Sequence, residues 1–326
     1  MPAPVRWGVI GSTSRVARLA VLPALATAAG CEVVATASTS RPSAATHGDD
    51  YQAVLDDPAV EAVYIPLPNH LHREWVERAA AAGKHVLCEK PLARTASEAL
   101  AMADACAAGG VVLSEAYMTP FHPRSRALLR LVNEGRLGRL LFARTSFTGL
   151  LEPADDHRWR WDAGGGALLD VGIYCIAPLL AAFGREPVSV AASAHLTAPV
   201  VDGGVDASCS GWLDFGHGAA AAFACSFEAP ELQRTEFIGT SAAVALERAF
   251  TPGPHDVSLV LRHRNGTTED LGAEAGPGDD PYRLMVEHVS SVIRGDAAPE
   301  RTPADSIALL ALLDRLRAAA GMPAAA

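Results

Sequence analysis

Short apolar segments alternate with helical patterns along the first 116 residues of this 326-residue chain. The apolar segments, residues 5–10, 32–38, 60–67, 86–88 and 111–116, have the length and composition of buried strands. Buried strands that alternate with helices build a doubly wound parallel sheet with right-handed crossovers. We therefore expect an α/β fold whose first domain covers residues 1–121.

The pattern changes beyond Tyr117, where prolines punctuate the chain and a second domain, residues 122–326, is expected to begin. Turn signals such as Gly216-His217-Gly218 separate its strand-like runs, which indicates a large, mostly antiparallel open sheet. The runs cover residues 140–148, 188–196, 205–215, 219–227, 235–239, 242–247 and 257–263. Two helices follow between residues 281 and 319, and we expect the last one, about 303–319, to pack back on the first domain.

The composition is that of a globular chain, with 49% hydrophobic and 20% charged residues. A net charge of −10 argues against sequence-independent binding to nucleic acid or anionic membranes, because both rely on a basic surface. Six cysteines without a C-x-x-C pair suit a reducing cytoplasm, and His70 and His72 lack the spacing of a metal pair on a helix. No run approaches the ~18 residues of a membrane helix, and the N-terminal apolar stretch is too short for a signal peptide. We expect a soluble cytoplasmic protein without a metal site.

The turn after the first strand is a candidate phosphate-binding loop. Its residues are Gly8, Gly11, Ser12, Thr13, Ser14 and Arg15. Such a turn presents backbone N–H groups and the positive end of a helix to an anion. A hydroxyl residue stands where the second glycine of G-x-G-x-x-G would be, so the motif is incomplete. A strand-to-helix turn without a ligand explains it equally well.

Ser38, Thr39, Ser40 and Arg41 follow the second strand, where an NAD site usually has an acid for the ribose 2′-OH. Here the acid is absent, and hydroxyls and a cation could meet a 2′-phosphate. We expect NADP(H) to be preferred and NAD(H) to be possible, with these residues and Arg15 as contacts. A solvated loop arginine is the alternative.

Glu89-Lys90-Pro91 ends the fourth apolar segment. Pro91 has no N–H and ends the ladder, which places Lys90 at the C-terminal edge of the sheet, where open α/β sheets bind ligands. Taken alone, the pair is also consistent with solvated loop charges. After the third strand, Asn69 and His72 are candidate polar contacts to cofactor or substrate, with helix capping as the alternative.

In the second domain, residues 164–166 are three glycines before a helical pattern and allow a close approach of backbone or ligand. Asp170 and Tyr174 are four residues apart, so on a helix both point to one cleft. The candidate substrate contacts around them are Tyr117, His122, Arg158, Trp159 and Trp161, with Glu115, His157 and Arg160 as further candidates. Aromatic faces beside hydrogen-bonding groups suit a sugar ring, and an arginine suits a phosphate. Alternatively, the tryptophans are core or interface anchors.

Together these segments resemble the Gfo/Idh/MocA family of NAD(P)-dependent oxidoreductases, over nearly the whole chain. Residues 5–11, 64–70, 89–91 and 164–174 carry the resemblance. It implies an N-terminal Rossmann domain and a C-terminal α/β domain whose open sheet often forms an oligomer interface, so a homo-oligomer is expected. It also implies that Lys90 acts at the reacting carbon, with a cis peptide before Pro91. The cofactor contacts that follow from it are Pro66, Leu67, Glu89 and Lys90.

Tyr174 stands where the family commonly has a histidine. The substitution is shared with a subgroup that contains dihydrodiol and xylose dehydrogenases, glucose-fructose oxidoreductase and sugar-nucleotide C-3 ketoreductases. We expect hydride transfer between NADP(H) and a carbinol or keto carbon of a sugar or sugar-like polyol, a nucleotide-linked keto-sugar being one candidate. The catalytic candidates are Lys90, Tyr174 and Asp170, because a neighbouring ammonium lowers the pKa of a phenol that must move a proton. The alternatives are an NADP- and sugar-sensing regulatory protein and a redox-assisted glycosidase on the same fold.

Overall fold

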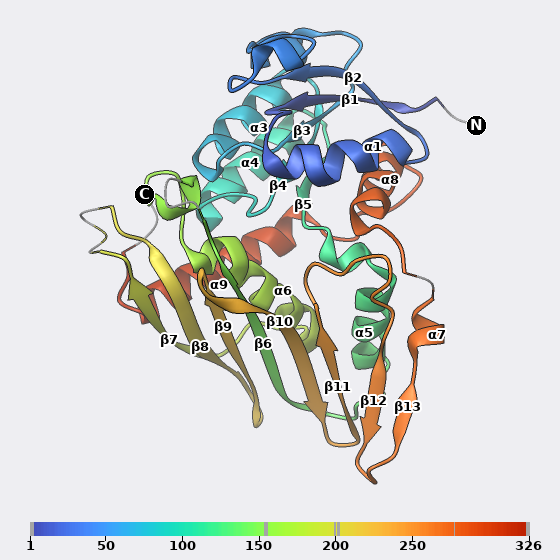
Figure 1. Cartoon of the computed structure of the whole chain (residues 1–326), viewed down its shortest axis with the longest axis vertical. Coiled ribbons are helices and arrows are strands. Elements are labelled where there is room, and N and C mark those ends of the chain that lie inside the picture. The colour runs from blue at the N-terminus through green and yellow to red at the C-terminus, as the bar shows by residue number, and fades with distance from the viewer. Residues whose placement is uncertain (1–2, 153–155, 199, 201–202, 277, 324–326) are drawn as a thin grey trace. The chain divides into compact units, whose positions relative to one another are not determined.

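The computed structural model describes residues 3–152, 156–198, 200, 203–276 and 278–323. The chain divides into two compact units (Figure 1). Unit 1 comprises Met1–Met118 and Tyr282–Ala308, and unit 2 comprises Thr119–Pro281 and Leu309–Ala326. Within the described ranges, no helix has both the length and the apolar character needed to cross a membrane.

A five-stranded parallel sheet forms the centre of unit 1, with the strand order β2-β1-β3-β4-β5. Its strands are β1 (Val5–Ile10), β2 (Cys31–Ala37), β3 (Ala62–Ile65), β4 (His85–Glu89) and β5 (Leu113–Ala116). The helices between them are α1 (Leu22–Thr27), α2 (Tyr51–Asp56), α3 (His72–Ala81) and α4 (Ala96–Ala108). The doubly wound parallel sheet expected from the alternating pattern is confirmed.

Strands β1, β3, β4 and β5 of unit 1 are largely buried on both faces, and the edge strand β2 is more exposed. All four residues of β3 are buried, and Trp7 of β1 has no exposed surface. Continuous apolar strands of this kind are typical of parallel sheets covered by helices on both sides. The Trp7 Nε1–H donates to the Ser290 hydroxyl at 3.3 Å, which joins α8 (Pro281–Ile293), late in the chain, to the first strand.

Unit 2 contains an eight-stranded sheet with the order β13-β12-β11-β10-β6-β9-β8-β7. Its strands are β6 (Leu140–Leu150), β7 (Ser189–Leu196), β8 (Asp206–Gly216), β9 (Ala219–Ser226), β10 (Glu228–Gly239), β11 (Ala242–Glu247), β12 (Val260–His263) and β13 (Thr268–Asp270). Neighbouring strands are antiparallel except β6 and β9, which are parallel. The expected large, mostly antiparallel sheet is confirmed.

The two faces of this sheet differ. On β8, Leu213 is fully buried and its neighbour Trp212 is 47% exposed, as expected for side chains that alternate between a covered and an open face. The helix α6 (Ile173–Phe183) packs on the covered face, where the rings of Phe183 and Phe215 stack at 3.9 Å. We call the other face of the sheet, to which Trp212 points, the outer face.

The remaining helices of unit 2 are α5 (Pro123–Asn133) and the short α7 (Gly272–Ala275), and the boundary between the units falls within α9 (Pro303–Ala319). Three local features differ from the sequence expectations. β10 begins at Glu228 rather than near 235, and β13 had no predicted counterpart. The partner of β10 is β6, far earlier in the sequence, and the partner of β13 is β12, the strand directly before it. In both cases, strand pairing supplies hydrogen bonds to residues whose own composition does not favour a strand. The expected helix at 168–174 begins with a π-helical turn, η6 (Leu168–Gly172).

Candidate active site

The turns after β1 and β3 meet at the point in unit 1 where the strand order reverses. Gly11 has a φ of +91°, and a Cβ there would lie 2.8 Å from the Leu67 side chain and 3.4 Å from the Pro66 carbonyl oxygen. Only glycine fits so close an approach in this conformation. Open α/β sheets bind ligands at such a reversal, beyond the carboxyl ends of the strands. The structure therefore brings together three of the expected cofactor contacts.

A cluster of hydroxyl side chains joins the loops after β1 and β2. The Thr13 hydroxyl hydrogen-bonds with that of Ser38 and lies 2.6 Å from that of Ser40, and Ser38 and Ser40 are 3.3 Å apart. The Thr39 hydroxyl lies 3.2 Å from that of Tyr51. Arg15 and Arg41, the cations expected beside these hydroxyls, are both exposed. Hydroxyl donors with nearby exposed cations suit a phosphate.

Other residues of the first loop hold its conformation. The Ser12 hydroxyl donates to the Ala37 carbonyl at 3.3 Å, and the Ser14 hydroxyl accepts from the Ala17 N–H at 3.2 Å. Gly8 lies inside β1, where a Cβ would be 2.6 Å from a Val54 methyl group. Gly8 thus permits the packing of β1 against α2 and does not belong to the turn.

Three buried side chains hold the segment that carries Lys90. Glu89 accepts the Lys90 backbone N–H at 3.1 Å, and Glu115 of β5 accepts the Leu92 N–H at 2.9 Å. The ring nitrogens of His72 face carbonyl oxygens: Nδ1 lies 3.0 Å from that of Pro91, and Nε2 lies 2.8 Å from that of Leu67. The Lys90–Pro91 peptide is cis, as expected. The turns after β3 and β4 are therefore joined through one fully buried imidazole.

His72 and Glu115 make contacts inside unit 1 that the sequence did not predict. His72, a candidate cofactor contact, has no exposed surface, and burial lowers its pKa. Glu115, a candidate substrate contact, accepts from Arg301 Nε at 3.0 Å and from the Ser306 hydroxyl at 2.7 Å. Both side chains make hydrogen bonds inside unit 1 and hold the backbone of the Lys90 segment. Asn69 is also buried, with 8% of its surface exposed.

In unit 2, η6 and α6 carry the remaining catalytic candidates. Tyr174 is 5% exposed and packs edge-on against Phe147, with ring centroids 5.3 Å apart. Asp170 lies in η6, is 8% exposed, and has one carboxylate oxygen 3.5 Å from an Arg158 nitrogen. π-Helical turns recur at functional sites because they displace side chains from regular helix positions.

Asp206, at the start of β8, fixes the glycine turn that precedes η6. Its carboxylate accepts the Leu168 N–H at 2.6 Å. Burial raises the pKa of Asp206 to about 6, and the charge of the buried Arg317 acts in the opposite direction. Gly166 has a φ of +111°, and a Cβ there would lie 2.1 Å from an Asp206 oxygen. Asp206 falls within a predicted strand, and local sequence patterns give no sign of its contacts, because its partners are about 40 and 110 residues away.

The candidate substrate contacts are mostly engaged within their own units. Asp156, which the sequence analysis did not select, binds Arg158 through two hydrogen bonds of 2.9 and 2.8 Å, and these lower the pKa of Asp156 to about 2. The Trp159 ring packs edge-on against Phe227. Further candidates are placed as follows: Trp161 lies over the Arg317 guanidinium, His122 is buried and contacts the Gly253 carbonyl, and Tyr117 lies under the Arg301 guanidinium.

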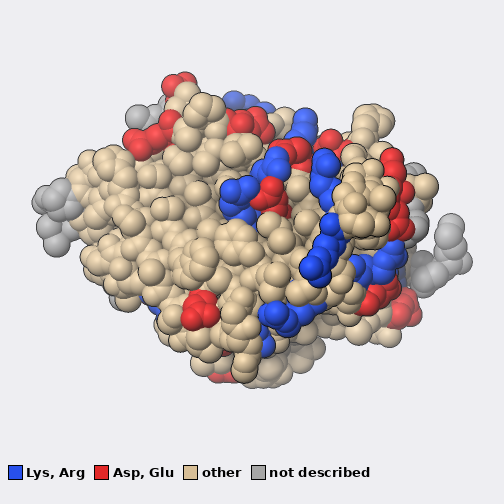
Figure 2. Space-filling view, turned by 90° about the horizontal axis from the view of Figure 1, so that it is seen from below, with Lys and Arg blue, Asp and Glu red and all other residues tan. Residues whose placement is uncertain are grey.

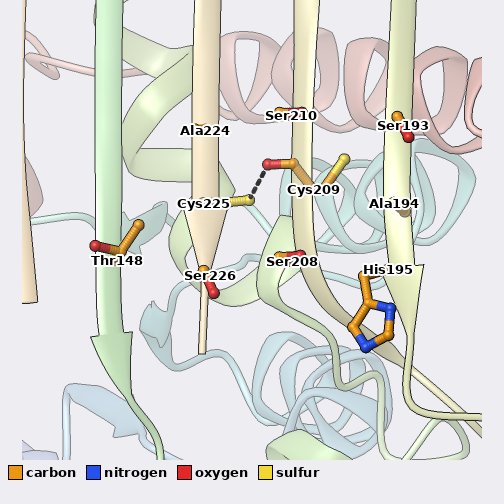
Figure 3. Close-up of a pocket in the computed structure, with 10 residues that line it drawn as sticks. All are labelled: Thr148, Ser193, Ala194, His195, Ser208, Cys209, Ser210, Ala224, Cys225 and Ser226. Carbon is orange, nitrogen blue, oxygen red and sulfur yellow. Dashed lines mark hydrogen bonds between the residues drawn. The ribbon is translucent and has the colours of Figure 1, made fainter. Parts of the chain in front are cut away.

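A shallow hollow of about 350 Å³ lies on the outer face of unit 2 (Figure 3). Its polar lining comes from β6, β7, β8 and β9: Thr148, Ser193, His195, Ser208, Ser210 and Ser226. Phe147 contacts Tyr174 from the covered face, so its neighbour Thr148 points to the opposite side of the sheet. The hollow is therefore separate from the Asp170 and Tyr174 segment.

Two family models match the chain in succession. Residues 5–117 match the oxidoreductase family with an NAD-binding Rossmann fold, and residues 125–245 match the GFO/IDH/MocA C-terminal domain. The chain is 37% identical over 305 residues to the uncharacterized oxidoreductase ORF334 of Rhizobium meliloti, covering 89% of each. The chain belongs to the Gfo/Idh/MocA oxidoreductase family.

Other members of the Gfo/Idh/MocA family cover almost the whole chain. A D-xylose 1-dehydrogenase (NADP(+)) of Haloferax volcanii is 33% identical over 320 residues, 95% of each chain. The crystal structure of the 3-ketoreductase KijD10 from Actinomadura kijaniata, in complex with NADP and TDP-benzene, superposes with a TM-score of 0.87 at 30% identity. That match covers 97% of this chain and 98% of the other. The resemblance inferred from the sequence is confirmed, and the chain is an oxidoreductase with a Rossmann domain.

The contact between Gly166 and Asp206 makes a stability prediction. Gly166→Ala should lower the free energy of unfolding by more than about 2 kcal/mol, because a left-handed backbone costs a non-glycine residue about 1–2 kcal/mol and the new methyl also collides with Asp206. Gly184→Ala is the matched control, since Gly184 has a φ of +61° and open space around its Cα. It should show the backbone cost alone in urea unfolding. Equal losses in the two variants would contradict the proposed contact.

Proposed function

We propose that the protein transfers a hydride between NADP(H) and a carbinol or keto carbon of a sugar or sugar-like polyol. The observation that carries the proposal is the arrangement of unit 1, where the tight Gly11 turn, the hydroxyl cluster and the Lys90 segment all follow carboxyl ends of one parallel sheet. We assign cofactor binding to residues 1–121 and substrate binding and oligomerisation to residues 122–326.

The residues fit an NADP nucleotide. Gly11 allows the turns after β1 and β3 to approach closely, and Thr13, Ser38 and Ser40 offer clustered hydroxyls without a carboxylate among them. Arg15 and Arg41 supply cations for the 2′-phosphate, and the turns at Pro66 and Lys90 are the proposed neighbours of the nicotinamide ring. A bound nicotinamide supplies the hydride, and the protein supplies orientation and proton transfer.

We assign the proton transfer to Lys90 and Tyr174. A carbinol that loses a hydride must also lose its hydroxyl proton, and a positioned tyrosine can accept it. The Lys90 ammonium would hydrogen-bond the same substrate oxygen and stabilise negative charge that develops there. Asp170 would bind a neighbouring hydroxyl of the substrate. The Asp156–Arg158 pair supports this assignment, because it holds an arginine beside the Asp170 carboxylate.

The relatives support a sugar substrate. The similar proteins include a xylose dehydrogenase, reductases named for dTDP-linked keto-sugars and a 1,5-anhydro-D-fructose reductase. All of them share the chain over 90% or more of its length. A free sugar and a nucleotide-linked keto-sugar both remain within the proposed class, and a panel of both kinds with NADPH and NADP is the direct assay.

Replacement of the catalytic residues should lower turnover strongly with little loss of cofactor affinity. Tyr174→Phe and Lys90→Ala are each expected to lower kcat by about 10²-fold or more, since general acid–base groups contribute that much. Lys84→Met is the control, because Lys84 is the only other lysine and its ammonium donates to the carbonyl oxygens of Asp57 and Val60 inside unit 1. Stopped-flow hydride transfer and NADPH fluorescence titration measure the two quantities. Unchanged kcat in Tyr174→Phe would refute its assignment.

Arg41 should discriminate between the two cofactors. Arg41→Ala is expected to weaken NADPH binding by about tenfold or more and NADH binding by less than about twofold, because a charge-assisted hydrogen bond to the 2′-phosphate is lost. Arg73→Ala, on the exposed surface of α3, removes a cation paired with Glu77 and should change neither affinity. Isothermal titration with each nucleotide tests the difference. Equal weakening of both nucleotides would remove the 2′-phosphate assignment.

We also propose that the protein forms a cytoplasmic homo-oligomer through the outer face. On that face β9 carries the small side chains of Ala220, Ala222 and Ala224, and Trp212 and Leu232 are 47% and 46% exposed. Figure 2 shows charged side chains of both signs interleaved in the centre and right of its view, while a broad area to the left carries few. All six cysteines are free thiols, as suits a reducing compartment.

Trp212→Lys should dissociate this oligomer, because it places a charge in an apolar contact. Leu100→Lys, which adds the same charge at a residue of α4 that is 51% exposed, is the control and should leave the mass unchanged. Light scattering coupled to size exclusion measures both. A wild-type monomer, or equal masses for Trp212→Lys and wild type, would exclude the outer face as the interface.

A further inference from the structure

A buried tyrosine lies behind the Lys90 segment. Tyr64 of β3 has no exposed surface, and its hydroxyl donates to Glu89 Oε1 at 2.7 Å. The other carboxylate oxygen of Glu89, Oε2, accepts the Lys90 backbone N–H at 3.1 Å. Glu89 itself is 7% exposed. The Glu89 carboxylate therefore links the Tyr64 hydroxyl, on the adjacent strand β3, to the backbone of Lys90, the proposed catalytic lysine.

We propose that Tyr64 is a positioning residue for Lys90, which acts by holding Glu89 as an ionised partner of the lysine. The inference rests on the proposed function, since it adds a residue to the machinery proposed there. Tyr64 is not itself in reach of the reacting atoms, because its hydroxyl is directed to Glu89 inside the sheet. Its contribution is to the charge and orientation of the Lys90 segment.

The charges around Glu89 make its ionisation sensitive to this hydrogen bond. Burial is the largest influence and raises the pKa of Glu89 to about 7, while the Tyr64 hydrogen bond and the Lys90 charge favour the ionised form. Glu115, from β5, is the other acid that faces it and favours the neutral form. Burial also raises the pKa of Tyr64 well above its usual value, so the phenol keeps its proton and stays a donor.

Two further titratable groups act on the pair, a thiol and a phenol. Cys88 precedes Glu89 on β4, and burial raises its pKa well above the usual value, so it stays neutral. Tyr282 of α8 faces Tyr64 and adds to the rise in the pKa of that phenol. Glu89 is thus the group of this set whose charge changes near neutral pH.

Loss of the Tyr64 hydroxyl should shift the pKa of Glu89 in one direction. A hydrogen bond to the carboxylate lowers its pKa, so Tyr64→Phe should raise the pKa of Glu89 above about 7. Loss of a hydrogen bond to a charged group corresponds to a shift of about one pH unit or more. At neutral pH the variant would carry a protonated Glu89, and Lys90 would lose its anionic partner. Above the raised pKa, the variant and the wild type should behave alike.

The first test is the pH profile of kcat. In the wild type, kcat should fall as the pH drops through about 7, and Tyr64→Phe should move this fall to higher pH by about one unit. On the acidic limb kcat would then be about tenfold lower in the variant, and on the alkaline plateau about equal. A merely structural role would instead lower kcat at all pH values. An acidic limb at the same pH in both proteins would overturn the proposal.

A double-mutant cycle and a matched control test whether Tyr64 acts on Lys90 through Glu89. Glu89→Gln should remove the acidic limb, and adding Tyr64→Phe to it should change kcat by less than about twofold, because the effect of Tyr64 passes through Glu89. Ser290→Ala removes another buried side-chain hydrogen bond of unit 1, that from Trp7, and should leave the limb in place. Additive losses in the double variant would contradict an action through Glu89.

A second test needs no substrate, so it separates this inference from the proposed function. The chain has two lysines, Lys84 and Lys90, and protein labelled with ¹³C-lysine should give two assignable side-chain signals. The Lys90 signal should report the Glu89 titration near pH 7, the step should move up by about one unit in Tyr64→Phe, and it should vanish in Glu89→Gln. Lys84 serves as the internal reference. The same titration step in wild type and Tyr64→Phe would refute the proposal even if turnover is never found.

Discussion

A buried carboxylate that accepts a backbone N–H supports each of the two segments with candidate catalytic side chains. Glu89 does so for Lys90 in unit 1, and Asp206 does so for Leu168, at the start of the turn that leads to Asp170 and Tyr174, in unit 2. Burial raises the pKa of both acids, and a cation opposes the rise in both: Lys90 in the first case and Arg317 in the second. Each segment is thus held by a buried carboxylate, whose burial is costly unless it is paired. Loss of one partner of the carboxylate should therefore disturb the position of the segment.

The same fold is found in family members that are named for different sugars. The parallel sheet of unit 1 fixes where strands end, and the side chains beyond those ends define what can be bound. The relatives carry names with different sugars, yet they match this chain over nearly its full length. The fold is therefore common to proteins that are named for different sugars.

Strands, helices and the family were accessible from the sequence, whereas the contacts of individual side chains were not. Apolar runs located β1 and β6 within a few residues, because buried strands need apolar side chains. β10 was underestimated, since it continues past an irregularity around Pro230 to Glu228, where pairing with Leu150 of β6 resumes. The contacts of His72 and Asp206 were not predicted, because their partners are set by tertiary packing and not by local spacing.

The hydroxyl cluster after β1 and β2 has a consequence for selectivity. Thr13, Ser38 and Ser40 already hydrogen-bond one another, so no donor is stranded when the phosphate is missing. A site strongly rejects a ligand that lacks one group when the absence of that group leaves buried polar side chains without a hydrogen-bond partner. Binding of NAD(H), which lacks the 2′-phosphate, would carry little of this cost here, because the hydroxyls bind one another. Preference for the phosphorylated nucleotide would then depend on attraction rather than exclusion. This preference for NADP(H) should weaken as ionic strength rises, because salt screens the attraction between the phosphate and the arginines. In a cell with more NAD(H) than NADP(H), the enzyme would then also use NAD(H).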